Sequence, residues 1–213
     1  MNVIEIFGSI EGEGVRAGEL CTFIRLSECN LRCSYCDTTY SFEPGEEMSV
    51  DEIVQRVNDI GFKNITITGG EPLLQDIRPL IDALHDYDIN IETNGSINPI
   101  PMYGNFPNVF FTVDYKGPSS DMEGFMNNGD VLTELSKYDV IKFVVGTIED
   151  LDRMRELITN NDYAAAVYVS PVFGRIEAKD IVEYVKQYKD ELKNVRVQLQ
   201  IHKFIWPPDM KGV

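Results

Sequence analysis

Three cysteines stand close together in the chain: Cys29, Cys33 and Cys36 read C-x-x-x-C-x-x-C. Clustered thiolates of this kind bind iron–sulfur clusters or structural zinc, and such sites ordinarily have four protein ligands. Three is one fewer than a closed site needs. A metal site that lacks one protein ligand leaves a coordination position for a reactant, so this stretch indicates chemistry rather than scaffolding.

Structural zinc is the plainest alternative, with His85 or His202 as the fourth ligand. Zinc sites more often contain two ligand pairs, each with a two-residue spacing, and that arrangement is absent here. His85 also falls in an expected helix, where a surface position is the simpler interpretation. A redox disulfide is disfavoured because no isolated C-x-x-C accompanies a thioredoxin-like pattern. The fourth cysteine, Cys21, is interpreted as a small buried residue of a strand.

The overall composition fits an intracellular enzyme. The chain has 213 residues, enough for one domain with a sizeable core, and a formal net charge of −16. This acidity argues against binding to nucleic acid or to an anionic membrane, because both need an excess of Lys and Arg. No apolar run is long enough to span a membrane, and the first residues do not resemble a signal peptide. Four cysteines, three of them clustered, do not form a disulfide framework, so we expect a cytoplasmic location.

The elements that would position the cysteines alternate between strands and helices. Strands are expected at residues 3–7, 20–26, 63–68, 89–93, 109–113, 140–145, 165–169 and 195–201. Helices are expected near residues 50–60, 73–87, 149–158 and 178–189. Ser49 and Glu52 form a capping box at the start of the first helix.

Such alternation predicts parallel strands joined by helical crossovers. The connections at residues 95–108 and 117–130 look too short or irregular for full helices. We therefore expect an α/β fold, an incomplete TIM-like barrel of mostly parallel strands with fewer helices than strands, as a single domain over residues 1–213. In such barrels the chemistry gathers where the strands end. The cysteine loop and the other distinctive polar motifs all follow strands, which predicts one shared site.

The cysteine spacing resembles the signature of the radical S-adenosylmethionine superfamily. Gly69-Gly70-Glu71-Pro72 resembles the superfamily's GGEP segment after the second core strand, and Tyr35 matches the aromatic residue before the last cysteine. The resemblance implies one [4Fe–4S] cluster on the three cysteines, with S-adenosylmethionine chelating the open iron. Electron transfer would then break a C–S bond and produce a 5′-deoxyadenosyl radical, which the protein holds beside one chosen hydrogen.

The glycine-rich segment has a physical role in this interpretation. Gly69 and Gly70 lack a Cβ, so their backbone is expected to approach the cofactor closely. Glu71 or neighbouring backbone groups would take the methionyl ammonium. The simpler interpretation is a turn that opens a helix with Pro72 at its first position, and the two interpretations are compatible.

Further motifs extend a resemblance to the 7-carboxy-7-deazaguanine synthases of the 7-deazapurine (queuosine) pathway over nearly the whole chain. These motifs include residues 7–14, Arg25, Asp37-Thr38, residues 92–95 and residues 200–203. The resemblance implies conversion of 6-carboxy-5,6,7,8-tetrahydropterin to 7-carboxy-7-deazaguanine, a lyase reaction with hydrogen abstraction at C6, ring contraction and loss of ammonia. It also implies catalytic use of S-adenosylmethionine, Mg²⁺, an electron donor such as flavodoxin or ferredoxin, and a homodimer.

The resemblance assigns roles residue by residue. Substrate binding falls on Ile10, Glu11, Gly12, Glu13, Arg25, Thr68 and Glu92. Cofactor binding falls on Tyr35, Cys36, Asp37, Gly69, Gly70, Glu71, Asp114, Tyr115, Lys116, Ser170, Pro171, Val172 and Phe173, and Thr38 matches the Mg²⁺ ligand. A guanidinium suits a carboxylate because it binds both oxygens, so Arg25 is expected to pair with the substrate carboxylate. Its apolar neighbours make a plain surface charge the less natural interpretation.

The chain departs from the family pattern at three places. Asp114 stands where relatives often have serine, Glu11 stands where glutamine is common, and residues 208–213 continue beyond Pro207, where many relatives end. Two other functions also stay open from sequence. One is a small activase that makes a glycyl radical on a partner protein, and the other is a non-catalytic iron–sulfur or zinc protein. The activase does not explain the turn at residues 11–14 together with Arg25, and the non-catalytic protein would hold a metal without turnover.

Overall fold

The computed structural model describes residues 1–103, 105–126 and 129–213. In these residues nine strands form one sheet in the order β3-β1-β2-β4-β5-β6-β7-β8-β9. The strands are β1 (Asn2–Ile10), β2 (Leu20–Leu26), β3 (Glu46–Glu47), β4 (Asn64–Gly69), β5 (Asp88–Thr93), β6 (Val109–Tyr115), β7 (Val140–Val145), β8 (Ala166–Pro171) and β9 (Val195–Val197). Neighbours from β2 to β9 run parallel, whereas β1 is antiparallel to both β2 and β3.

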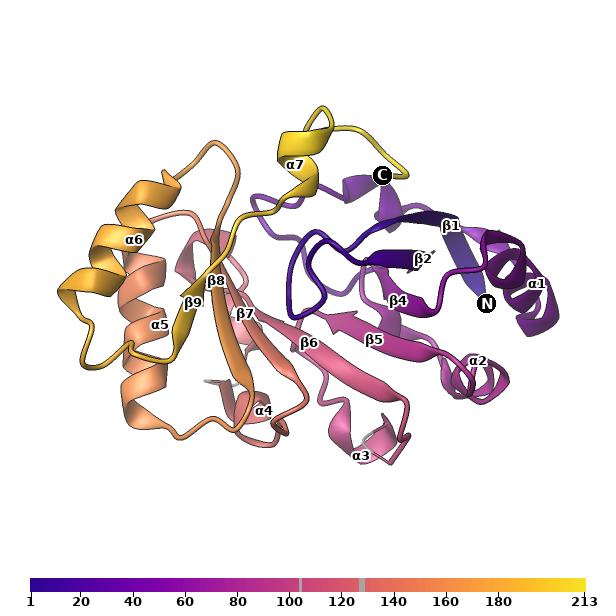
Figure 1. Ribbon diagram of the computed structural model, residues 1–213, viewed down its shortest axis with the longest axis horizontal. Coiled ribbons are helices and arrows are strands. Elements are labelled where there is room, and N and C mark those ends of the chain that lie inside the picture. The colour runs from indigo at the N-terminus through magenta and orange to yellow at the C-terminus, as the bar shows by residue number, and fades with distance from the viewer. Residues whose placement is uncertain (104, 127–128) are drawn as a thin grey trace.

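Seven α-helices accompany the nine strands in the described part of the chain. They are α1 (Val50–Ile60), α2 (Arg78–Ala83), α3 (Ile100–Tyr103), α4 (Asp130–Thr133), α5 (Ile148–Asn160), α6 (Ala178–Gln187) and α7 (His202–Ile205). Short 3-10 helices lie at η1 (Thr39–Phe42), η2 (Pro72–Leu74), η3 (Pro118–Ser120) and η4 (Glu123–Phe125). Helices α1 and α2 flank one end of the sheet and α5 and α6 the other (Figure 1). None of the described helices combines the length and apolarity needed to cross a membrane.

The sheet curves without closing, so the predicted incomplete α/β barrel with fewer helices than strands is confirmed. The burial of strand β7 illustrates what stabilises the sheet. All six of its residues are buried, which is typical of a parallel strand covered on both faces. Ile141 and Phe143 pack into the hydrophobic core, while Lys142 and Val144 point into the barrel, as the period of two requires.

One helix is shorter than the sequence predicted. Residues 73–87 do not form a single helix, because η2 ends at Leu74 and α2 begins only at Arg78. Pro79 explains the break, since a proline fits the first turn of a helix but would remove a hydrogen bond from its interior. The Gln75 side chain between the two helices bonds the backbone N–H and C=O of Asn2 instead.

The connections expected to lack full helices contain only short turns where the structure describes them. The first holds the four-residue α3 and the second holds η3 and η4. Residue 104 of the first connection and residues 127–128 of the second lie outside the described residues.

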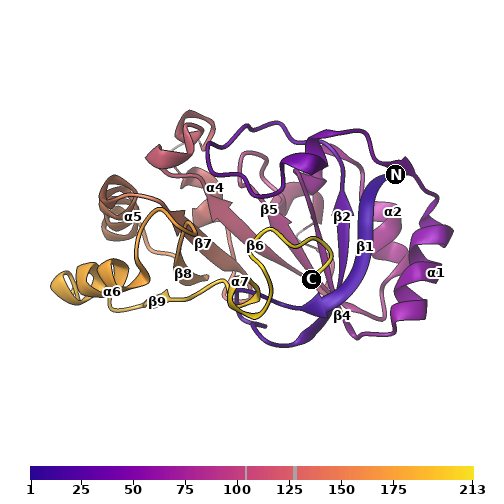
Figure 2. The ribbon, with the colours of Figure 1, turned by 90° about the horizontal axis from the view of Figure 1, so that it is seen from above.

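The gap between β9 and β1 is bridged by loops. Strand β9 ends at Val197 rather than at Ile201 as predicted. The Gln198 amide instead accepts from Gly14 N at 2.7 Å and donates to Gly14 O at 3.0 Å, and Ile201 N donates to Gly12 O at 3.1 Å. The segment after β9 therefore joins the turn after β1, and the end of the chain runs back toward β1 (Figures 1 and 2).

The predicted capping box at α1 is confirmed and can be tested. Ser49 Oγ accepts from Glu52 N, and Glu52 accepts from Ser49 N at 2.7 Å. Ser49→Ala leaves the Glu52 N–H group without its side-chain partner, so we expect the free energy of unfolding to fall by about 1 kcal/mol in urea titrations. Thr159→Ala, on the exposed surface of α5, is the matched control and is expected to change it by less than about 0.5 kcal/mol. Equal losses would contradict the capping role.

Candidate active site

One cavity of about 730 Å³ opens where the parallel strands end. Its walls come from the turn after β1, the cysteine loop, the ends of β4 to β7, and the chain after β8 and β9, including residues 208–213. Motifs that lie far apart in the sequence therefore share one enclosure, as the sequence predicted. This volume is in the range of small-molecule sites in proteins.

All three clustered cysteines line this cavity. Their loop is held internally, because the Arg32 guanidinium donates to Cys29 O at 2.7 Å, and from outside, because Ser34 N donates to Ser120 O at 3.0 Å. Burial raises the pKa of the Cys33 thiol to about 11. The thiolate form that iron binds is therefore costly until a cation arrives, which is the usual coupling of metal binding to deprotonation.

The arrangement of the thiols suits a cluster better than a single ion. In the described residues, no three side chains of His, Cys, Asp or Glu gather tightly enough to enclose one metal ion. Each thiolate of a [4Fe–4S] cluster binds a different iron, so the three sulfurs do not need to converge on one point. The donor set of three thiols lining one cavity fits such a cluster with one iron left open.

Positions 69 and 70 require glycine because neighbouring backbone excludes a Cβ there, a reason that the sequence did not reveal. A Cβ on Gly69 would lie 2.4 Å from Leu26 O, and a Cβ on Gly70 would lie 2.1 Å from Glu28 O. The space that a side chain would fill is thus occupied by β2 and the start of the cysteine loop. Both glycines line the cavity, but their lack of a Cβ serves the packing of strand β4 against this loop.

Glu71 does not face the cavity, in contrast to the expectation that it takes the methionyl ammonium. Its carboxylate is fully buried and accepts from Leu73 N at 3.0 Å, Thr93 Oγ1 at 2.9 Å and Asn94 N at 2.8 Å. Burial raises the pKa of Glu71 despite these bonds. The side chain joins the ends of β4 and β5, so only neighbouring backbone groups of this segment can meet a cofactor.

Asn94 is a site residue that the sequence-based assignment missed. Its amide nitrogen lies 3.8 Å from Cys29 Sγ and donates to Asn30 Oδ1 at 3.0 Å. An N–H directed at a cysteine ligand changes the reduction potential of an iron–sulfur cluster. The position of Asn94 directly after strand β5 was the signal that could have identified it.

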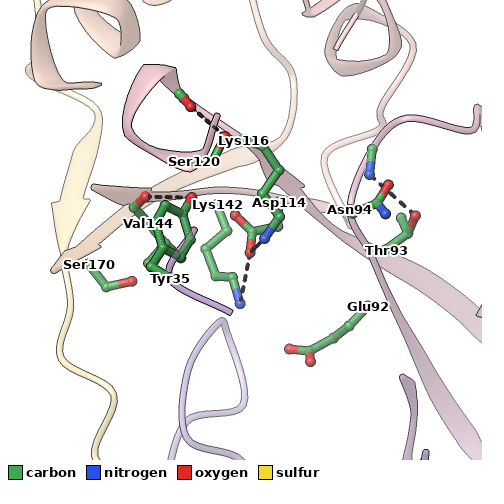
Figure 3. A network of polar contacts seen from close by, with 12 residues as sticks. Tyr35, Glu92, Thr93, Asn94, Asp114, Lys116, Ser120, Lys142, Val144 and Ser170 are labelled. Carbon is green, nitrogen blue, oxygen red and sulfur yellow. Dashed lines mark hydrogen bonds and ion pairs between the residues drawn. The ribbon is translucent and has the colours of Figure 1, made fainter. Parts of the chain in front are cut away.

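A chain of alternating charges crosses the cavity. Glu13 and Lys142 approach to 3.2 Å, Lys142 and Asp114 to 3.8 Å, and Asp114 and Lys116 to 2.8 Å. Figure 3 shows Asp114 between the two lysines. Burial alone would lower the pKa of Lys142, but the surrounding carboxylates of Glu13, Glu92 and Asp114 raise it well above its ordinary value. Burial would also lower the pKa of Lys116, but Asp114 raises it, so both lysines stay cationic at the centre of the site.

Glu13 and Glu92 are partly buried acids in different environments. Burial would raise the pKa of Glu13, but Lys142 and hydrogen bonds from Ser170 and Gln200 hold it below its ordinary value. Burial raises the pKa of Glu92, whose bonded neighbour is Thr68 at 3.4 Å. The Glu92 carboxylate extends toward the Lys142 ammonium (Figure 3). The sequence-based assignment included both acids but missed Lys142 and Gln200.

Arg25 lines the cavity and is mostly buried. Its Nε donates to Glu5 Oε1 at 2.7 Å, and Tyr40 donates to the same oxygen at 2.8 Å. In the described residues this is the one nitrogen of Arg25 in a hydrogen bond, so its terminal nitrogens are available to a ligand. The guanidinium is thus an oriented cation of the cavity wall.

Thr38 and Asp37 lie at the other side of the cysteine loop. The half-buried Thr38 donates its hydroxyl to Asp37 Oδ1 at 2.9 Å, and Lys203 pairs with Asp37 Oδ2 at 2.5 Å. Lys203 belongs to α7, so this ion pair fastens the end of the chain to the cysteine loop. Both Thr38 and Asp37 line the cavity.

The remaining predicted residues divide between the cavity and the layers behind it. Ile10, Glu11, Gly12, Tyr35, Val172 and Phe173 line the cavity. Ser170 and Pro171 do not line it, although Ser170 supports Glu13 from behind. The Tyr115 side chain lies in the core, and its hydroxyl donates to Glu123 at 3.1 Å. Contrary to the prediction, Tyr115 therefore does not reach the cavity. Asp114, in the same strand, and Lys116, directly after it, face the cavity instead.

Comparisons with known proteins agree with this geometry. Residues 24–170, which begin within β2 and end within β8, match the Radical SAM superfamily. A 7-carboxy-7-deazaguanine synthase of Clostridium acetobutylicum is 45% identical, over 99% of this chain and 98% of the relative. The chain belongs to the 7-carboxy-7-deazaguanine synthase family. A family member of Chlorobaculum tepidum is 36% identical over 100% of this chain and 97% of the relative. The crystal structure of QueE from Escherichia coli shares the fold, with a TM-score of 0.71, 23% identity and 93% coverage of both chains.

Membership of the radical SAM superfamily implies a [4Fe–4S] cluster and S-adenosylmethionine. The three cysteines lie inside the matched segment, and so do Gly70 and Asp114. In the described residues, Asp114 Oδ1 is buried without a hydrogen-bond partner. A buried acceptor of this kind is costly unless a ligand supplies a donor. The site therefore fits a polar cofactor beside the cysteine loop.

The packing of Gly70 gives a test of the site. We expect Gly70→Ala to push the cysteine loop away from β4, because the added methyl group meets the backbone of Glu28. The free energy of unfolding should fall by about 1–3 kcal/mol, and less iron should be retained after reconstitution. Iron analysis and visible absorption measure the second effect. Gly124→Ala is the matched control, since its Cβ would meet open space. Normal iron content in Gly70→Ala would show that this contact does not position the loop.

Proposed function

We propose that this protein converts 6-carboxy-5,6,7,8-tetrahydropterin to 7-carboxy-7-deazaguanine. The observation that carries the proposal is the shared cavity, in which the three-cysteine loop faces a wall of buried acids and Arg25. The printed name of the full-length relatives supports the same reaction. Hydrogen abstraction at C6 of the pterin is followed by ring contraction and loss of ammonia.

The cofactor half of the cavity lies beside the cysteine loop. When bound, the cluster and S-adenosylmethionine supply a 5′-deoxyadenosyl radical. We assign Cys29, Cys33 and Cys36 to the cluster, and the cavity residues Tyr35, Asp37, Gly69, Gly70, Asp114, Lys116, Val172 and Phe173 to S-adenosylmethionine. The free oxygen of Asp114 offers an acceptor to the cofactor's hydroxyl or ammonium donors. Residues 208–213 line the outer side of the cavity and help to exclude water from it.

The substrate half holds acceptors for the pterin ring and a cation for its carboxylate. A pterin edge carries N–H donors, and Glu11, Glu13 and Glu92 present carboxylate oxygens in the cavity. Arg25 pairs with the substrate carboxylate through its terminal nitrogens. Because Glu92 has a raised pKa and Glu13 a lowered one, the two acids differ in proton affinity. We assign proton exchange with the substrate to Glu92 and fixed orientation to Glu13.

Magnesium is proposed for the region of Thr38. Its hydroxyl is a single weak ligand, but Mg²⁺ commonly keeps several waters and takes further oxygens from a substrate. The neighbouring Asp37 carboxylate is already paired with Lys203. We also propose a homodimer and an electron donor such as flavodoxin or ferredoxin, as the family resemblance implies, and a single domain over residues 1–213.

The reaction can be tested directly with a substrate deuterated at C6. Anaerobically reconstituted protein is given S-adenosylmethionine, reductant, Mg²⁺ and the carboxypterin. We expect formation of the deazaguanine acid and transfer of deuterium to the 5′ carbon of the adenosyl group, both followed by mass spectrometry. Reactions without Mg²⁺ should be slower. Cleavage of S-adenosylmethionine without change of the pterin would contradict the proposal and favour an activase. Zinc in place of iron, with no cleavage, would favour a structural protein.

Arg25 provides a separate prediction. Arg25→Ala removes a charged partner of the substrate carboxylate, so we expect substrate affinity to fall by about 100-fold. The visible absorption of the cluster should stay intact. Arg25→Lys keeps the charge but loses the planar fork, and an intermediate affinity is expected. Anaerobic calorimetry with the carboxypterin measures both variants.

The control for Arg25 is Arg56→Ala, which removes an exposed arginine 3.7 Å from Glu46. It should leave substrate affinity unchanged. Loss of the cluster in Arg25→Ala would assign a structural role to Arg25 through its pair with Glu5, and unchanged affinity would remove it from the substrate site.

A further inference from the structure

Arg16 is a buried cation that the mechanism above does not use. It lies in the turn between β1 and β2 and is 9% exposed. Its NH2 group lies 2.9 Å from Glu11 Oε1 and donates to Ile65 O at 3.0 Å and Thr66 Oγ1 at 3.1 Å. Its NH1 group donates to Asp88 O at 3.1 Å. The guanidinium therefore spans the starts of β4 and β5, at the opposite strand ends from the cysteine loop, and reaches Glu11 from there.

The backbone of the turn keeps Arg16 in this place. Glu11 N donates to Glu19 O at 2.9 Å, Gly18 N donates to Glu11 O at 2.8 Å and Glu19 N donates to Arg16 O at 2.9 Å. The guanidinium also lies 4.9 Å from the centre of the Phe110 ring. The side chain is thus fixed by a closed turn, by strand carbonyls and by an aromatic face, which limits its freedom to leave Glu11.

The contacts of Glu11 are one-sided. The Glu11 side chain lines the cavity, although its residue is only 3% exposed. The hydrogen bonds from Arg16 and Thr66 to its carboxylate both end on Oε1, and the buried Cys21 thiol is a further neighbour of this carboxylate. The support behind the carboxylate therefore occupies one oxygen and leaves Oε2 for a ligand in the cavity.

We propose that Arg16 is a positioning residue for substrate recognition, which holds Glu11 so that its second oxygen accepts hydrogen bonds from the N–H donor edge of an aminopyrimidinone ring. This inference rests on the proposed function, because a pterin carries such an edge. An ionised carboxylate only accepts hydrogen bonds, whereas a glutamine amide presents a donor and an acceptor. The Glu11–Arg16 pair thus selects for a donor edge. A buried carboxylate without its cation is strongly disfavoured, so Glu11 depends on Arg16.

A double-mutant cycle tests the dependence. Arg16→Met and Glu11→Gln are made separately and together, and binding of the carboxypterin to reconstituted protein is measured by anaerobic calorimetry. We expect Arg16→Met alone to weaken binding by about tenfold or more, and to have less than about threefold effect in the Glu11→Gln background. The visible absorption of the cluster and the affinity for S-adenosylmethionine should stay unchanged. Arg78→Met, an exposed arginine paired with Asp76, is the control.

Arg16→Lys keeps the positive charge, so we expect it to bind the carboxypterin more tightly than Arg16→Met does. If Arg16 acted only through its bonds to strand carbonyls, this partial recovery would not be expected. If Arg16→Met does not fold, the same cycle with Arg16→Lys decides whether Arg16 acts on binding through Glu11. Equal effects of the Arg16 change in both backgrounds would overturn the proposal and make Arg16 a structural residue that holds Ile65 and Asp88. Failure of the unmodified protein to bind the carboxypterin would overturn the proposed function itself, and with it the ligand assigned to Glu11.

Discussion

The close approach between the end of β4 and the start of the cysteine loop is the constraint on which the site depends. Gly70 has no room for a Cβ there, and Glu71 N donates to Glu28 O at 2.8 Å. The buried Glu71 carboxylate then binds Asn94 N at the end of β5, and the Asn94 amide reaches Asn30 in the cysteine loop. The loop is therefore held by two strand ends and by backbone groups, which keeps the thiols at one wall of the cavity.

The charges inside the cavity differ from those of the whole chain. The chain carries a formal net charge of −16, yet Lys116, Lys142 and Arg25 are largely buried in the site. Each of them faces a carboxylate, and such buried pairs add little net stability because desolvation offsets the attraction. Their effect is on orientation, since an ion pair restricts the conformations that each side chain can adopt. Lys142, between Glu13 and Asp114, links the turn after β1 to the end of β6 across the cavity.

Local patterns in the sequence predicted much of this molecule, while contacts between distant elements escaped prediction. The bounds of β2 and β7 and the capping box of Ser49 depend on period and local chemistry, and all were predicted. Alternation along β6 shows that Tyr115 and its neighbours face opposite sides, but not which side holds the cavity. The partners of Glu71 depend on the approach of two strands, which no local pattern encodes. Lys142 could have been identified as a site residue from the sequence, because it is the one charged residue of an apolar strand.

The loop closure beside β9 gives the turn after β1 a second role. Strand β9 does not pair with β1, and the Gln198 amide instead bonds both backbone groups of Gly14. A Cβ on Gly12 would lie 1.9 Å from Nδ1 of His202, so this glycine lets α7 approach the turn. The turn that presents Glu11 and Glu13 to the cavity is thus also the surface that seats the chain after β9. Because Lys203 joins that same segment to Asp37 beside the last cysteine, the turn after β1 and the cysteine loop are connected through the last helix as well as through the sheet.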